Sequence, residues 1–136
     1  MPTATESTTQ AVVLLVEHDV LVRMTLASYL RECRYRVVEA VDGTEALTVL
    51  QHAPLEVDAV LTDATLPPGA IDGFRLAQWL RQNKPDIQVL IAGTPARAAA
   101  GAAKLCEDGP TLAKPYDPQI VESRIRWLLA ARQRRP

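Results

Sequence analysis

The sequence predicts an α/β protein built around a parallel sheet. Short apolar runs of the length of buried strands alternate with longer segments of helical period. Five such strand–helix pairs follow one another along 136 residues, a length that suits one domain with a single core. We therefore expect one parallel sheet whose strands are joined by helices.

The first half of the chain contains two of these pairs. The first strand covers residues 12–16, and Asp19 caps the helix that follows it. The apolar face of that helix carries four residues at helical spacing, Val22, Leu26, Leu30 and Cys33. The second strand covers residues 36–40, and an Asp-Gly turn introduces a helix at about residues 44–51. This helix should bury Ala46, Leu47 and Leu50.

A loop rich in proline and glycine interrupts the middle of the chain at residues 63–73. It follows a third strand at residues 59–62 and precedes a third helix at residues 74–82 and a fourth strand at residues 89–92. Loops at the carboxyl ends of strands are where α/β proteins bind ligands. Its position makes this loop a functional candidate.

Two further helices are predicted in the last third of the chain. Thr94 and Pro95 form a capping signal for an alanine-rich helix at residues 96–105, and a short fifth strand covers residues 111–113. Asp117 and Pro118 repeat that signal for a last helix, whose apolar stripe comprises Ile120, Val121, Ile125, Leu128 and Leu129. At the edge of the stripe, the Trp127 indole either packs half-buried, which its position favours, or anchors a partner.

The charge of the chain gives no reason to expect nucleic acid or an anionic membrane as a partner. The 15 basic and 16 acidic residues leave a net charge of −1. No apolar run approaches the roughly 18 residues of a membrane span. We expect a polar, disordered tail at residues 1–10, one domain at residues 11–131 and a solvated basic tail at residues 132–136 of a cytoplasmic protein. Cys33 and Cys106 lack disulfide or metal spacing, so both should be reduced core residues.

Polar and charged residues follow four of the predicted strands. Because the carboxyl ends of parallel strands gather along one edge of a sheet, these residues should approach one crevice. They are Glu17, His18, Asp19, Asp63, Gly93, Thr94 and Lys114. Each has a structural alternative, since acids after strands cap helices and loop lysines are solvated. The set taken together favours a functional site.

Five short motifs follow one another along the chain. They are VLLVEHD at residues 13–19, VDAVLTD at residues 57–63, the Leu66-Pro67 and Asp72-Gly73 pairs, PDIQVLIAGT at residues 85–94, and LAKPYDP at residues 112–118. In this order and spacing they resemble the receiver domain of two-component response regulators over about residues 11–131. The resemblance implies a flavodoxin-like, doubly wound, five-stranded parallel sheet in the order 2-1-3-4-5, with helices on both faces.

The resemblance also implies a role for each site residue. Asp63 would accept a phosphoryl group from a phosphohistidine on a histidine kinase or a histidine phosphotransferase. Asp63 and Glu17 would hold Mg²⁺, Glu17 through water, and Thr65 would offer the metal its backbone carbonyl. Lys114 would contact a phosphate oxygen, and a cis peptide bond would precede Pro115. Phosphoryl transfer needs an in-line nucleophile and cations that offset charge, which is chemistry that these residue types supply.

Several positions depart from the family pattern. His18 stands where a second acid usually ligates Mg²⁺, and because imidazole suits transition metals better, Mg²⁺ affinity should be weakened. The switch hydroxyl aligns with Gly93, although a shift of one residue would let Thr94 serve. Thr111 replaces the switch aromatic ring, so the switch is degenerate. Arg34 stands where a left-handed residue such as glycine is common, which implies mild strain or a different cap.

Two functions remain open at this point. The first is a stand-alone receiver that is phosphorylated on Asp63 and signals through contacts with a downstream protein; the second is a degenerate receiver that binds proteins without phosphorylation. Neither is an enzyme beyond its own phosphoryl transfer and aspartyl-phosphate hydrolysis. The retained Asp63 and Lys114 favour the first.

Other classes of function fit less well. A small-molecule site is disfavoured because the first loop has no glycine-rich cradle, and too few residues remain for a helix-turn-helix. The fourth helix, the fifth strand and the last helix with Trp127 form the surface where we expect a partner or a homodimer contact.

Overall fold

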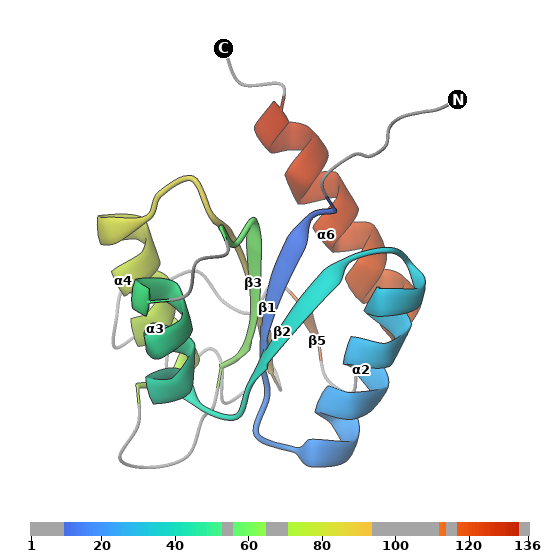
Figure 1. The fold of residues 1–136 in the computed structure, drawn as a ribbon, viewed down its shortest axis with the longest axis horizontal. Coiled ribbons are helices and arrows are strands. Elements are labelled where there is room, and N and C mark those ends of the chain that lie inside the picture. Colours follow the sequence, from blue (N-terminus) through green and yellow to red (C-terminus); the bar gives the residue numbers. More distant parts are fainter. Residues whose placement is uncertain (1–9, 53–55, 65–70, 94–111, 114–116, 134–136) are drawn as a thin grey trace.

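A computed structural model of the chain contains one parallel sheet of five strands in the order β2-β1-β3-β4-β5. The structure describes residues 10–52, 56–64, 71–93, 112–113 and 117–133. All four strand pairs are parallel, and helices cover both faces of the sheet (Figure 1). The predicted fold class and strand order are confirmed.

The elements follow the predicted order along the chain. Their bounds are β1 Val12–Val16, α2 Val20–Glu32, β2 Arg36–Ala40, α3 Gly43–His52, β3 Ala59–Asp63, α4 Gly73–Asn83, β4 Gln88–Gly93, β5 Leu112–Ala113 and α6 Pro118–Gln133. The first two strands match their predicted bounds, and the other described elements differ by one residue or a few at their ends. The predicted helix at residues 96–105 lies outside the described residues.

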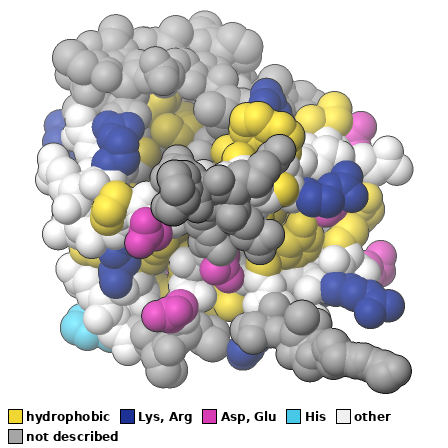
Figure 2. Space-filling view, turned by 90° about the horizontal axis from the view of Figure 1, so that it is seen from above, with side chains coloured by type: hydrophobic (Ala, Val, Ile, Leu, Met, Phe, Trp, Pro, Cys, Tyr) yellow, Lys and Arg dark blue, Asp and Glu magenta, His cyan; other side chains and the backbone are white. Residues whose placement is uncertain are grey.

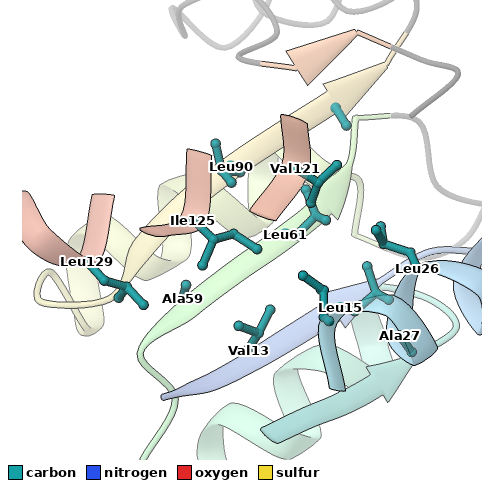
Figure 3. Packing of buried hydrophobic residues seen from close by; sticks show 12 residues of the cluster. Val13, Leu15, Leu26, Ala27, Ala59, Leu61, Leu90, Val121, Ile125 and Leu129 are labelled. Atoms are coloured by element: carbon teal, nitrogen blue, oxygen red, sulfur yellow. The ribbon is translucent and has the colours of Figure 1, made fainter. Parts of the chain in front are cut away.

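One face of the sheet is covered by α2 and α6 (Figure 1). Side chains alternate along each strand, so every second residue of β1 and β3 points to this face. Figure 3 shows Val13 and Leu15 of β1 packed with Leu26 of α2, and Leu61 of β3 below α6. The apolar stripes predicted for the two helices therefore form this half of the core.

The opposite face of the sheet is covered by α3 and α4. The intervening residues of β1 contribute here, together with buried positions of the two helices. These residues are Val12, Leu14, Val16, Ala46, Leu50, Leu76 and Leu80. Leu47 is only half-buried, but it packs against the same cluster. The two-sided burial explains why β1 is a continuous apolar run rather than an alternating one.

Three expectations about individual side chains are wrong. Ile120 and Trp127 of α6 are 52% and 61% exposed, although we expected Ile120 in the stripe and Trp127 half-buried. A helix that packs on a sheet buries a limited stripe, and here Val121, Ile125 and Leu129 fill it. Cys33 is a free thiol at the C-cap of α2, where it is half-buried rather than a core residue.

The residue after that cap adopts a left-handed conformation. Arg34 has a φ of 75° and is exposed. Its N–H donates to the Arg31 carbonyl at 3.0 Å, and Tyr35 N–H donates to the Leu30 carbonyl at 3.1 Å. These bonds satisfy carbonyl groups in the last turn of α2. Glycine is the residue usually found at such a left-handed position, because it adopts a positive φ without strain.

The amino-terminal edge of the sheet is closed by hydrogen bonds between β1 and the approach to β3. Val12 N–H donates to Asp58 Oδ2 and Asp58 N–H donates to the Val12 carbonyl, both at 2.8 Å. Seen from this edge, the described basic side chains lie scattered among acidic and hydrophobic ones (Figure 2). None of the described helices is long and apolar enough to cross a membrane.

Candidate functional site

Glu17 and Asp63 occupy equivalent places on neighbouring strands. Val16 of β1 pairs with Thr62 of β3, and each acid is the next residue along its strand. Both carboxylate-bearing residues are nearly inaccessible, with 1% of Glu17 and 7% of Asp63 exposed. Burial of acids is costly unless polar partners or a cation accompany them. The parallel register thus brings two acids to one point on the carboxyl edge of the sheet.

The backbone and side chain of Glu17 are held by neighbouring groups. Its N–H donates to the Ala40 carbonyl of β2 at 3.0 Å, which continues the pairing of the two strands. Its Oε2 accepts a hydrogen bond from the Asp19 N–H at 3.0 Å. Its carbonyl accepts a bond from Arg23 Nη1 at 2.8 Å. Hydrogen bonds therefore hold Glu17 at its N–H, at its carboxylate and at its carbonyl group.

The next two residues serve different purposes. Asp19 caps α2, because its Oδ1 accepts from Leu21 N–H at 2.9 Å and from Val22 N–H at 3.1 Å. This confirms the cap that the sequence predicts. His18, between the two acids, is exposed. The imidazole is thus not packed into the carboxylate site of Glu17 and Asp63.

The backbone around Asp63 is clamped between β4 and the start of α4. Ala64 N–H donates to the Ala92 carbonyl at 2.6 Å, and Gly73 N–H donates to the Ala64 carbonyl at 3.3 Å. A Cβ added to Gly73 would collide with the Asp63 carbonyl oxygen and would lie 2.9 Å from the Ala64 Cα. Only glycine allows α4 to begin so close to the Asp63 backbone.

The end of β4 carries no side-chain hydroxyl. Gly93 is the last residue of that strand, is buried, and pairs with Ala113 of β5. Lys114 follows Ala113 in the chain but lies beyond the part of it that the structure describes. The same holds for four other predicted site residues, Thr65, Thr94, Thr111 and Pro115.

The described residues meet the needs of a hard divalent cation in part. Two carboxylates at one edge offer the oxygen ligands that Mg²⁺ prefers. Within the described ranges, however, no group of three or more histidine, cysteine, aspartate or glutamate side chains could hold a metal. His18 lies between Glu17 and Asp19 and is exposed. The part of the chain that the structure describes thus offers two buried carboxylates, Glu17 and Asp63, at this edge.

An exposed apolar patch borders the carboxyl edge of the sheet. We did not predict it from the sequence. It lies on the first turns of α2 and comprises Val20, Leu21 and Met24, which are 52%, 76% and 58% exposed. The sequence pattern shows these residues to be apolar but does not show which face of the helix they leave to solvent. The patch follows directly on the Glu17–Asp19 turn.

The strand order and the buried acid pair at the carboxyl edge of the sheet are the features that the resemblance to receiver domains led us to expect. In agreement with this, the family model described as "Response regulator receiver domain" matches residues 13–126. The chain belongs to the response regulator receiver domain family of two-component signalling proteins.

Two curated relatives illustrate in which kinds of protein similar sequences occur. Sensor kinase CckA of Brucella abortus (strain 2308) is 39% identical over 87 residues, which cover 64% of this chain and 9% of that protein. The "Probable transcriptional regulator ycf27" of Cyanophora paradoxa is 34% identical over 121 residues, or 86% of this chain and 47% of that protein. The chain thus spans half or less of the length of these two relatives.

Solved receiver structures have the same architecture. The signal receiver domain of an HD domain-containing protein from Pseudomonas fluorescens Pf-5 superposes with a TM-score of 0.78 at 27% identity, covering 93% of this chain and all (100%) of that one. The receiver domain of hybrid histidine kinase CckA gives a TM-score of 0.69 at 28% identity, covering 88% of this chain and 99% of that one. The fold is that of the family.

Proposed function

We propose that this domain accepts a phosphoryl group on Asp63. The observation that carries the proposal is the pairing of two buried acids, Asp63 and Glu17, at the end of adjacent strands. A carboxylate oxygen of Asp63 would attack the phosphorus of a phosphohistidine, and the N–P bond would break with its electron pair leaving on the imidazole nitrogen. Catalysis of such a transfer is mostly positioning and electrostatics.

A divalent cation would be held by the two carboxylates, Glu17 and Asp63, with the Thr65 carbonyl as a further oxygen ligand. When bound, Mg²⁺ offsets the charge that develops on the phosphoryl oxygens. Lys114 would contact one of those oxygens. Because His18 supplies no carboxylate, we propose that Mg²⁺ affinity is weakened relative to a site with three acids.

The phosphodonor would be a histidine kinase or a histidine phosphotransferase. Two matched proteins, one a sensor kinase and one a hybrid histidine kinase, carry a related domain, which supports such a donor. We propose that the domain performs no catalysis beyond its own phosphorylation and the hydrolysis of the aspartyl phosphate. Its output would be a contact with a downstream protein.

The test is phosphorylation by acetyl phosphate in the presence of Mg²⁺, followed by intact-mass spectrometry. Wild type should gain the mass of one phosphoryl group, and Asp63→Asn should gain none. The gain should need a higher Mg²⁺ concentration in wild type than in His18→Asp, which restores a carboxylate. Absence of a gain in wild type would refute the proposed function.

A second candidate is a degenerate receiver that binds proteins without phosphorylation. Two observations favour it, the exposed His18 in place of an acid and the absence of a hydroxyl at Gly93. The same experiment separates the candidates. If wild type gains no mass while His18→Asp does, the histidine has converted the site into a phosphorylation-independent module.

The output surface would include α6. Its Trp127 and Ile120 are 61% and 52% exposed, and large exposed apolar side chains on a helix suit an anchor for a protein partner or for a second copy of this chain. Trp127→Ala should weaken self-association in analytical ultracentrifugation or binding of the downstream partner. If both stay unchanged, α6 is not the output surface.

A further inference from the structure

The guanidinium group of Arg23 links the backbone of Glu17 to Glu39 on the neighbouring strand β2. Arg23 lies on α2, next to β2 (Figure 1). Its Nη1 donates to the Glu17 carbonyl at 2.8 Å, and its Nε lies 3.2 Å from Glu39 Oε1. Only 16% of the Arg23 side chain is exposed, so these bonds are shielded from competing water.

A second arginine completes this network at the surface. Arg31 Nη1 lies 3.2 Å from Glu39 Oε2, and Arg31 Nη2 donates to the Val37 carbonyl at 2.9 Å. Arg31 is 49% exposed and Glu39 is 29% exposed. The network therefore runs from solvent at Arg31, through both oxygens of Glu39, to Arg23 and the backbone of Glu17.

The bond to the Glu17 carbonyl fixes the peptide plane between Glu17 and His18. A peptide unit is rigid, so holding its oxygen also sets the direction in which the chain leaves β1. The next N–H along, that of Asp19, holds the Glu17 carboxylate at 3.0 Å. The Asp19 N–H belongs to the following peptide unit, so a change in the path of the chain at the 17–18 peptide would displace the donor that orients the carboxylate.

We infer that Arg23 is a positioning residue that holds the Glu17 carboxylate in place at the sheet edge, with Glu39 aligning its guanidinium. The functional meaning of this inference rests on the proposed phosphoacceptor function. Arg23 acts through the backbone and touches neither the phosphoryl group nor the metal. An ion pair that served stability alone would behave differently, and Arg31 supplies the comparison because it shares Glu39 but does not reach Glu17.

The test compares Arg23→Ala, Arg23→Lys and Arg31→Ala by amide hydrogen exchange. Exchange at the Asp19 N–H reports its bond to Glu17 and needs no phosphorylation, while exchange at Ile125 reports global opening. Relative to Ile125, Asp19 should exchange about tenfold faster in Arg23→Ala, since a bond from a charged donor is lost. Arg31→Ala should leave that ratio unchanged, and Arg23→Lys should restore part of the protection through one donor.

Binding of Mn²⁺, followed by electron paramagnetic resonance of the free ion, is the second readout. Arg23→Ala should bind Mn²⁺ about tenfold more weakly than Arg31→Ala, because a displaced carboxylate is a poorer ligand. If Arg23→Ala and Arg31→Ala give the same Asp19 exchange ratio and the same Mn²⁺ affinity, the inference is overturned. Failure of wild type to be phosphorylated would refute the proposed function but would leave the exchange comparison to decide on Arg23.

Discussion

The Tyr35 hydroxyl donates a hydrogen bond of 3.0 Å to Glu122 Oε2, across 87 positions of the sequence. It joins the segment before β2 to α6, and Arg126 Nη2 lies 3.5 Å from the other oxygen of the same carboxylate. Glu122 keeps this second partner when the tyrosine is changed. Tyr35→Phe should therefore lower the free energy of unfolding by about 1 kcal/mol, the net contribution of one hydrogen bond. Urea denaturation at neutral pH measures this change in the free energy of unfolding. An unchanged urea midpoint in Tyr35→Phe would contradict the prediction.

The same tyrosine should make stability depend on pH in alkaline solution. Burial, and then the hydrogen bond to Glu122, raise the pKa of the Tyr35 phenol. The folded state thus holds the phenolic proton more tightly than the unfolded state, whose tyrosine has a pKa of about 10. The contribution is complete below about pH 10 and is lost as pH rises from there through the raised folded pKa. Urea midpoints between pH 8 and 11 should fall more steeply in wild type than in Tyr35→Phe.

Replacement of Arg34 by glycine should stabilise the fold. The φ of 75° puts an L-residue in the left-handed region, at a cost of about 1 kcal/mol that glycine does not incur. Part of this gain is offset by the greater freedom of glycine in the unfolded chain. The melting temperature of Arg34→Gly should rise, whereas Arg34→Ala, which keeps the strain and removes the same charge, should not. A lower melting temperature for Arg34→Gly than for Arg34→Ala would refute this interpretation.

A methyl group at Gly73 should disturb both stability and phosphorylation. The added Cβ would meet the Asp63 carbonyl and the Ala64 Cα, so the backbone of Asp63 must shift, at a cost of about 2 kcal/mol. Gly43→Ala is the matched control, because its Cβ would meet the Ile71 carbonyl instead. With both variants folded, the acetyl phosphate reaction should slow more in Gly73→Ala than in Gly43→Ala. Equal rates would show that Asp63 does not depend on this contact.

Two isoleucines of α6 provide a test of its packing. Ile125 points toward the sheet (Figure 3) and is 0% exposed. Ile120, by contrast, is 52% exposed. Ile125→Ala should lower the free energy of unfolding by about 3 kcal/mol, since it removes buried area and leaves a cavity. Ile120→Ala should change it by no more than about 0.5 kcal/mol. Comparable losses for the two variants would mean that α6 packs differently in solution.

Much of the fold could be predicted from periodicity because each element satisfies a local rule. The continuous apolar run of β1 and the Asp19 cap of α2 are visible in neighbouring residues alone. The face of α6 was harder to predict. Ile120 and Trp127 lie near the edge of an apolar stripe, and which edge a sheet covers depends on tertiary packing.

Part of the candidate site could likewise be predicted from the sequence, and part of it could not. Strand ends predict that Glu17 and Asp63 converge, and the register of β1 with β3 confirms it. The role of Arg23 could not be predicted, because its partner Glu39 lies 16 residues away on another strand. Conversely, the residues expected to complete the phosphate site, Lys114 and Thr65, remain predictions from the motifs.

The segment from Ala64 to Gly73 begins and ends at one place, since the two residues share a hydrogen bond of 3.3 Å. Lengthening a chain between two joined ends costs only closure entropy, about 0.6 kcal/mol for each doubling. Insertions between these two residues leave Asp63 in its position at the end of β3, paired with Ala92 of β4. The length of this segment can therefore change over evolution without any change in the placement of Asp63.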